Sequence, residues 1–128
     1  MDSEPNKSKL TLVVGATDNP ERYPYRAAEL LQAKGVPFVP IGIKKGMVFG
    51  EEILDLRQMP ALERIHTITL YLGPQNQSEW IDYLIGLGPR RIIFNPGTEN
   101  SAFFSKAKAA GIEALEACTL VMLTTGQF

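Results

Sequence analysis

The residues best suited to chemistry lie in the stretch GATDNPERYPYR, at positions 15–26, between an apolar run and a helical pattern. Gly15 lets the backbone come close to a ligand, and Ala16 is small enough not to block it. Thr17 and Asn19 carry side-chain donors for the oxygens of a phosphate group. The helix that follows presents free N–H groups and a partial positive charge to an anion. We interpret the stretch as a phosphate-binding loop. An ordinary tight turn is the alternative, because a dinucleotide fingerprint needs further glycines.

Positive charge surrounds this loop in the sequence. Arg22 and Arg26 flank the expected helix start, while Lys44 and Lys45 follow Gly42 after the second apolar run. In a dinucleotide-binding domain, an acidic residue at that strand end accepts hydrogen bonds from the ribose hydroxyls. A pair of lysines suits a phosphorylated ribose instead, which favours NADP or coenzyme A over NAD. Two solvated loop lysines are the alternative interpretation.

Two further turns follow expected strands. Tyr71, Leu72 and Gly73 end the third strand, and an aromatic residue beside a glycine suits the wall of a nucleotide crevice. Plain core packing of Tyr71 explains the pattern equally well. The polar turn NPGTEN at 95–100 precedes a helix and suits contact with a ligand or a partner subunit. Ordinary turn and cap chemistry is the alternative there.

No catalytic or metal-binding constellation accompanies these turns in the sequence. His66 is the single histidine and opens an expected strand at the end away from the crevice, where a structural role is typical. Cys118 lies among apolar residues and is expected to be packed rather than nucleophilic. One histidine and one cysteine do not make a zinc site of the usual kind. We therefore expect no metal, no catalytic residue and no enzymatic activity.

Strand and helix patterns alternate along the chain and must position these turns. Five strands are predicted from apolar runs, at residues 10–14, 37–41, 66–71, 91–94 and 112–117. Helices are predicted over 25–34, 73–85 and 100–110, a loop or small hairpin over 42–54, and irregular structure over 54–64. Such short connections imply right-handed βαβ units. The predicted fold class is α/β, a Rossmann-like three-layer sandwich with a mostly parallel five-stranded sheet, whose ligands lie beyond the carboxyl ends of its strands.

The composition limits the domain number, the partners and the compartment. We expect one domain over 9–128 after a flexible tail over 1–8, because 128 residues is an ordinary length for one domain. A net charge of −1 without a long basic block argues against nucleic acid as a partner. No run approaches membrane-spanning length, and the first residues lack a signal-peptide pattern. We therefore expect no membrane association and a cytoplasmic location.

The first loop resembles the opening of the small coenzyme A-binding domain proteins. Their loop typically runs Gly-Ala-Ser, then Asn-Pro and Arg, then a Ser-Tyr pair that opens the helix. The matching positions here are Gly15-Ala16-Thr17, Asn19-Pro20, Arg22 and Pro24-Tyr25, with threonine and proline in place of the usual serines. The segments PIGIKKG and FGEEIL also resemble family segments, so the similarity extends over almost the whole chain. The same domain forms the N-terminal part of the alpha subunit of succinyl-CoA synthetase.

This resemblance implies a Rossmann-like domain that binds CoA or an acyl-CoA without the catalytic domain of the synthetase. It places the pyrophosphate on residues 15–20, the ribose phosphate near Lys44 or Lys45, and the adenine against residues 71–73. The expected cofactor-binding residues are Gly15, Ala16, Thr17, Asn19, Pro20, Arg22, Tyr25, Arg26, Gly42, Lys44, Lys45, Tyr71, Leu72 and Gly73. Two other interpretations stay open, an NADP-type binding module and an interaction or assembly protein with a vestigial nucleotide site. A homodimer is a further expectation.

Overall fold

A six-stranded parallel sheet forms the centre of the computed structural model, which describes residues 7–128. Its strands are β1 (Thr11–Val14), β2 (Phe38–Gly42), β5 (Leu54–Asp55), β6 (Thr67–Leu70), β7 (Arg91–Phe94) and β8 (Glu113–Glu116). They lie in the order β5-β2-β1-β6-β7-β8, and every neighbouring pair is parallel. The strands β3 (Met47–Val48) and β4 (Glu51–Glu52) form a separate antiparallel hairpin.

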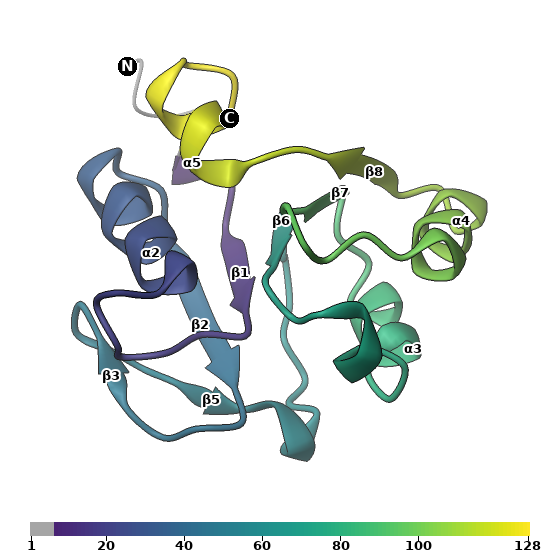
Figure 1. Ribbon diagram of the computed structural model, residues 1–128, viewed down its shortest axis with the longest axis horizontal. Coiled ribbons are helices and arrows are strands. Elements are labelled where there is room, and N and C mark those ends of the chain that lie inside the picture. Colours follow the sequence, from purple (N-terminus) through teal and green to yellow (C-terminus); the bar gives the residue numbers. More distant parts are fainter. Residues whose placement is uncertain (1–6) are drawn as a thin grey trace.

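Helices cover both faces of the sheet, as Figure 1 shows. The helices α2 (Tyr23–Ala33) and α5 (Thr119–Thr124) lie on one face, while α3 (Ile81–Gly86) and α4 (Ser101–Ala109) lie on the other. Two single turns of 3-10 helix, η1 (Leu56–Gln58) and η2 (Pro74–Asn76), complete the elements of residues 7–128. The predicted α/β class with a Rossmann-like three-layer arrangement is confirmed.

Alternating side chains of the buried strands explain the two apolar cores. Leu12 and Val14 of β1 pack into the core beneath α3 and α4, whereas Val13 between them packs into the core beneath α2 and α5. The alternation follows from strand geometry, because successive side chains point to opposite faces. Both faces of the central strands are covered, which is why every residue of β1, β6 and β7 is buried. The sheet is therefore a rigid support for the turns at its carboxyl edge.

Three sequence predictions need correction. The sheet has six strands rather than five, because Leu54 and Asp55, expected in an irregular segment, pair in parallel with Ile41 and Gly42 of β2. The apolar segment after Cys118, for which no helix was predicted, forms α5. The helix expected over 73–85 is divided into η2 and α3. Residues 1–6 of the expected flexible tail lie outside the described residues.

The strand order reverses between β1 and β6, because the chain leaves β1 toward β2 and later returns to the other side of β1 at β6. Turns on the two sides of this point lead away in opposite directions, which opens a crevice beyond the strand ends. The turns after β1, β2, β6 and β7 all reach that edge. None of the described helices is both long enough and apolar enough to cross a membrane.

Candidate functional site

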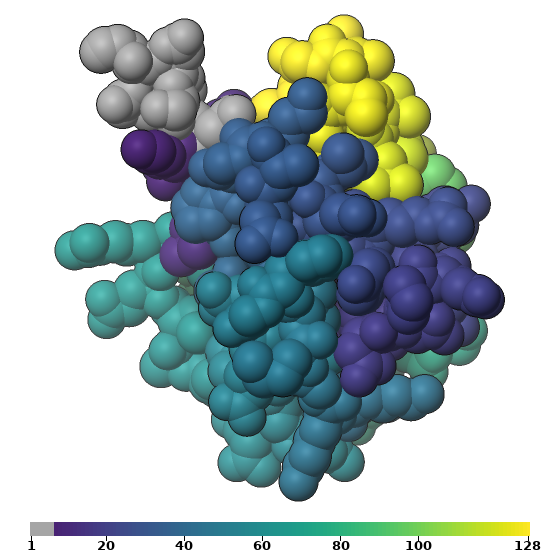
Figure 2. All heavy atoms as spheres, turned by 90° about the vertical axis from the view of Figure 1, so that its left-hand side faces the viewer, coloured from purple at the N-terminus to yellow at the C-terminus, as the bar shows by residue number. Residues whose placement is uncertain are grey.

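A cleft of about 680 Å³ opens at this carboxyl edge of the sheet. It is lined by residues 15–19, 22–24, 43–44, 71–73, 75–76 and 96–98. These segments follow β1, β2, β6 and β7, and they include the first turn of α2. Figure 2, viewed from the α2 side, shows the purple first loop at the surface, with the yellow C-terminal segment packed against α2 above it. The cleft thus lies where the strand order reverses.

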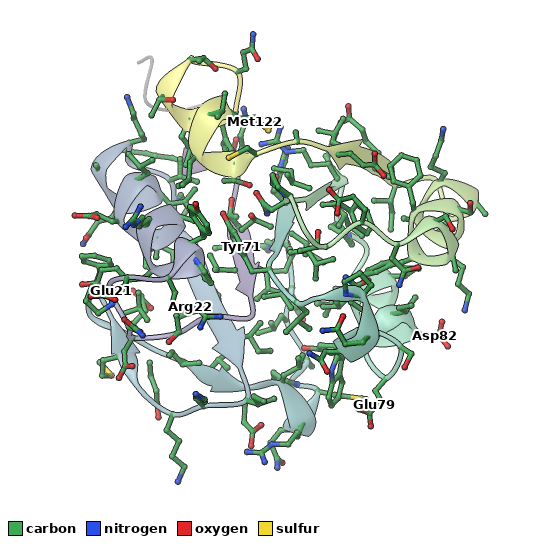
Figure 3. All side chains as sticks on the ribbon, in the orientation of Figure 1. Glu21, Arg22, Tyr71, Glu79, Asp82 and Met122 are labelled. Carbon is green, nitrogen blue, oxygen red and sulfur yellow. The ribbon has the colours of Figure 1, made fainter. Side chains whose placement is uncertain are left out.

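Most of the predicted cofactor-binding residues are brought together in this cleft. They are Gly15, Ala16, Thr17, Asn19, Arg22, Lys44, Tyr71, Leu72 and Gly73. Arg22 approaches from the start of α2, and Tyr71 lies between α2 and β6, as Figure 3 shows. Five predicted residues do not line the cleft, namely Pro20, Tyr25, Arg26, Gly42 and Lys45.

The structure shows which backbone N–H groups of the first loop are free to bind a ligand, and they are not those at the start of the loop. The N–H groups of Gly15 and Ala16 both donate to the carbonyl oxygen of Ile41, at 2.9 and 3.0 Å. They fix the loop to the end of β2 and are not available to a ligand. The backbone N–H groups of Thr17, Asp18 and Tyr23, in contrast, have no acceptor among the described residues. An anion would therefore be held by the outer part of the loop and the first residue of α2.

The side-chain donors of the loop remain available. Thr17 Oγ1 accepts from the Asn19 amide at 3.1 Å, and Asn19 Oδ1 accepts from the Glu21 amide at 3.0 Å. These bonds order the loop and still leave the Thr17 hydroxyl and the Asn19 amide nitrogen free to donate. Arg22 adds an exposed positive charge, whereas the Asp18 carboxylate adds a negative one to the same lining. The charges that the loop contributes to the cleft lining thus balance.

The helix that follows begins earlier than predicted, and this explains which of its residues miss the cleft. It starts at Tyr23, so Tyr23 and Pro24 line the cleft. Tyr25 is turned away and packs its ring on Phe49, with the ring centres 4.9 Å apart. Arg26 is exposed and places its guanidinium carbon 5.8 Å from the centre of the Tyr23 ring. Pro20 is an exposed loop residue outside the lining. Tyr25, Arg26 and Pro20 therefore do not line this cleft.

The two lysines after β2 are not equivalent. Lys44 lines both the cleft and an adjoining hollow of about 260 Å³, whereas Lys45 lines only the hollow. In that hollow Arg57 is already paired with Asp55, with the guanidinium nitrogen 3.0 Å from the carboxylate. Of the two lysines, Lys44 is the one that reaches the cleft.

Gly42 serves the site by allowing close approach rather than by lining it. A Cβ atom at this position would lie 2.9 Å from the Ala16 carbonyl oxygen, closer than real Cβ atoms come. The absence of a side chain therefore lets the end of β2 pack directly against the first loop. This contact stands beside the two hydrogen bonds to Ile41 that hold the same loop.

Several lining residues were not among the individual predictions. Gln75 and Asn76 of η2 lie on one side, and residues 96–98 lie after β7. The strand pattern did place both turns at the correct edge of the sheet. The strand pattern did not show which polar side chains of these turns would line the cleft, because their residue types are those of ordinary turns. Asp18 and Ile43 were likewise missed, although they stand inside the two segments that carried the prediction.

A fully parallel sheet with a cleft at the reversal of its strand order defines a Rossmann-like ligand-binding domain. Residues 9–124 match the family described as CoA binding domain. The chain belongs to this family, as the resemblance of its first loop indicated. No curated protein matches the chain.

Solved structures share the fold over nearly the whole chain. One, described as an uncharacterized protein, is 47% identical, with a TM-score of 0.91, and the match covers 94% of this chain and 98% of that chain. Prb, described as the PH1109 protein redesigned for binding, is 19% identical with a TM-score of 0.82, over 99% and 92% of the two chains. A hypothetical protein from Pyrococcus horikoshii OT3 is 23% identical with a TM-score of 0.79, over 94% and 84%. The last two likenesses concern the fold alone.

Proposed function

We propose that the protein binds coenzyme A, free or acylated, in the cleft at the carboxyl edge of the sheet and performs no chemistry on it. One observation carries the proposal. The polar loop before α2 and the side chain of Lys44 line the same cleft, which lies where the strand order reverses. Membership of the CoA-binding domain family supports the choice of ligand. Phosphate groups are recognised by the combination of free amides, hydroxyl donors and a nearby cation.

The order of the strands gives the proposed course of the ligand. Lys44 follows β2 and would hold the phosphate on the ribose. The amides of Thr17, Asp18 and Tyr23 follow β1 and would hold the pyrophosphate. The adenine would lie on the wall of the cleft formed by Leu72 and Gly73. The pantetheine arm would then run toward the ends of β7 and β8.

A role in binding rather than catalysis is supported by the chemistry of the lining. Apart from the Asp18 carboxylate and two cations, its ionisable side chains are Tyr23 and Tyr71. Burial raises the pKa of Tyr71 to about 12, although the nearby Thr69 and Thr119 hydroxyls act in the opposite direction. Tyr71 is therefore a neutral hydrogen-bonding group at physiological pH and not a general base.

Isothermal titration calorimetry with CoA, dephospho-CoA and NADPH tests the proposal. We expect CoA to bind and dephospho-CoA to bind about tenfold more weakly, the effect of one lost charge-assisted contact. Tighter binding of NADPH than of CoA would favour the NADP-type module, because NADPH also carries a phosphorylated ribose. Absence of binding by all three ligands would overturn the proposal.

A further inference from the structure

A second, smaller pocket of about 190 Å³ adjoins the cleft and is unlike it in character. Its lining residues are Tyr23, Tyr71, Asn95, Pro96, Cys118 and Leu120. The first two and Pro96 also line the cleft, so the two spaces share a wall and lie side by side. The pocket continues along the sheet edge from β6 and β7 to the segment after β8. Its position is thus at the opposite end of the cleft from Lys44.

The buried polar side chains around this pocket are hydrogen bonded within the part of the chain that the structure describes, with one exception. Asn95 donates from Nδ2 to Thr69 Oγ1 at 2.8 Å and accepts at Oδ1 from the Thr119 amide at 2.8 Å. The Thr69 and Thr119 hydroxyl oxygens lie 2.7 Å apart and are hydrogen bonded to each other. The hydroxyl of Tyr71 is buried near the Thr69 and Thr119 hydroxyls, which bond to each other, and it has no partner at hydrogen-bond geometry among the described residues. A buried hydroxyl without a partner is costly, and a ligand acceptor would relieve that cost.

We infer that this pocket receives the thioester end of a short-chain acyl-CoA, with the acyl chain among Pro96, Cys118 and Leu120 and the Tyr71 hydroxyl donating to the thioester carbonyl. The inference rests on the proposed function, because it assumes that the cofactor lies in the cleft. Lys44 follows β2, and Tyr71 follows β6, so a ligand with its ribose phosphate at Lys44 extends its other end toward the pocket. The ligand class is therefore a short acyl thioester rather than the free thiol.

The volume of the pocket limits the length of the acyl chain that it can hold. An apolar cavity of about 150 Å³ accommodates benzene, so a space of this size holds about six carbon atoms. A chain of two to four carbons fits with room for the thioester, whereas a ten-carbon chain does not. Each methylene taken from water into such a pocket tightens binding by about fourfold.

Calorimetric titration of the unmodified protein with CoA, acetyl-CoA, butyryl-CoA and decanoyl-CoA tests this selectivity. We expect affinity to rise from CoA to acetyl-CoA and again, by about fifteenfold for two more methylenes, to butyryl-CoA, and to fall for decanoyl-CoA. Equal affinities across the series would overturn the inference and leave CoA binding intact. Failure of every ligand to bind would overturn both the inference and the proposed function.

A matched pair of variants on α5 tests where the acyl chain of the ligand binds. Leu120→Trp fills the pocket and should lower the affinity for butyryl-CoA to that for CoA. Val121→Trp, one residue along the same helix, changes a side chain that is 54% exposed and absent from the pocket lining, and should retain the preference. Retention of the preference in both variants would place the chain elsewhere and overturn the inference.

The role of the Tyr71 hydroxyl is tested by comparing butyryl-CoA with its thioether analogue butyl-CoA, which lacks the carbonyl. The unmodified protein should prefer butyryl-CoA by about tenfold, the effect of one hydrogen bond from a buried donor. Tyr71→Phe should bring the ratio close to one. An unchanged ratio in Tyr71→Phe would overturn this assignment, whatever the absolute affinities.

The single cysteine provides a readout that does not depend on heats of binding. Cys118 lies in the pocket lining, so alkylation by iodoacetamide, followed by intact-protein mass spectrometry, reports occupancy of this space. Saturating butyryl-CoA should slow the reaction by at least fivefold more than saturating desulfo-CoA, which lacks both the thiol and the acyl chain. Equal protection by the two ligands would show that the acyl group lies outside the pocket.

Discussion

The side chain of Gln77 donates a hydrogen bond from Nε2 to the carbonyl oxygen of Thr98, at 2.8 Å, and so joins two turns of the cleft wall. The same nitrogen donates to the Leu72 carbonyl oxygen at 2.8 Å, and Oε1 accepts from Asn100 Nδ2 at 3.0 Å. Gln77 is only 1% exposed. One buried amide thus holds the turn after β6 against the turn after β7.

Replacement of Gln77 should therefore destabilise the protein. Gln77→Leu leaves the Leu72 and Thr98 carbonyls without their buried donor, and we expect the free energy of unfolding to fall by about 2 kcal/mol. Urea denaturation followed by circular dichroism measures the change. Gln75→Leu, at an exposed position two residues earlier, is the control and should stay within about 0.5 kcal/mol of the unmodified protein. Equal stabilities of the two variants would contradict the role of Gln77.

Gly42 should be intolerant of even the smallest side chain. The added Cβ of Gly42→Ala meets the Ala16 carbonyl oxygen at 2.9 Å, so the first loop must shift. We expect a loss of about 1–3 kcal/mol in the free energy of unfolding and weaker CoA binding, because the loop carries the phosphate donors. Gly86→Ala is the control. Nothing lies within 4 Å of its Cβ position, so it should be neutral or stabilising by about 0.5–1 kcal/mol.

The two lysines after β2 should differ in their effect on ligand binding. Lys44→Gln removes a cation that lines the cleft, so we expect about tenfold weaker binding of CoA and loss of the preference over dephospho-CoA. Lys45→Gln removes the same charge from a side chain confined to the adjoining hollow, and should change CoA affinity by less than about twofold. Equal losses in the two variants would show that the ribose phosphate lies between them.

The architecture was largely predictable from the sequence because its long-range organisation follows local patterns. Short runs rich in apolar and β-branched residues marked β1, β2, β6 and β7, since both faces of these strands are covered. The strand β5 could not be found in this way, because it has two residues and exists only through its pairing with β2. Short strands of this kind are determined by tertiary contacts rather than by composition.

The site was predictable as a set of turns and less so as a set of side chains. Glycine and polar residues after apolar runs identified the edge of the sheet and the first loop. The face of α2 that meets the cleft depends on the residue at which the helix begins, and a shift of two residues changes that face by about 200°. This is why Tyr25 and Arg26 were expected in the cleft, whereas Tyr23 lies there. The hydrogen bonds from the Gly15 and Ala16 amides to the Ile41 carbonyl oxygen likewise could not be predicted from the sequence, because they depend on how the loop packs against β2.

Removal of the Tyr71 hydroxyl should stabilise the protein without ligand. Tyr71→Phe keeps the ring and deletes a buried group that has no hydrogen-bond partner among the described residues, so we expect a gain of about 1 kcal/mol in the free energy of unfolding. Thermal and urea denaturation of the ligand-free protein measure it. A loss of stability would mean that the hydroxyl is satisfied in solution, and would contradict its assignment as a free donor.

The stability of the protein should decrease below neutral pH because of His66. This side chain precedes β6 and lines a hollow at the opposite end of the sheet with Lys9, Arg90, Arg91 and Glu113. Burial, and then the charges of Arg91, Lys9 and Arg90, hold the pKa of His66 below its ordinary value, while Glu113 acts weakly in the opposite direction. The unfolded chain, with a histidine pKa near 6.5, therefore binds more protons than the folded chain as the pH falls through that value. Protonation thus favours unfolding, and stability is lost as the pH falls from about 7 toward the lower folded-state pKa.

The contribution of His66 can be separated from that of the carboxylates by difference. The free energy of unfolding is measured by urea denaturation at pH 7.5, 6.5 and 5.5 for the unmodified protein and for His66→Gln, which cannot gain the proton. His66 is the single histidine, so the difference between the two proteins isolates its titration. We expect the unmodified protein to lose more stability than His66→Gln between pH 7.5 and 5.5. Parallel pH profiles would mean that the four neighbouring charged groups leave the imidazole with its ordinary pKa, because only a pKa that differs between the folded and unfolded chains makes stability depend on pH.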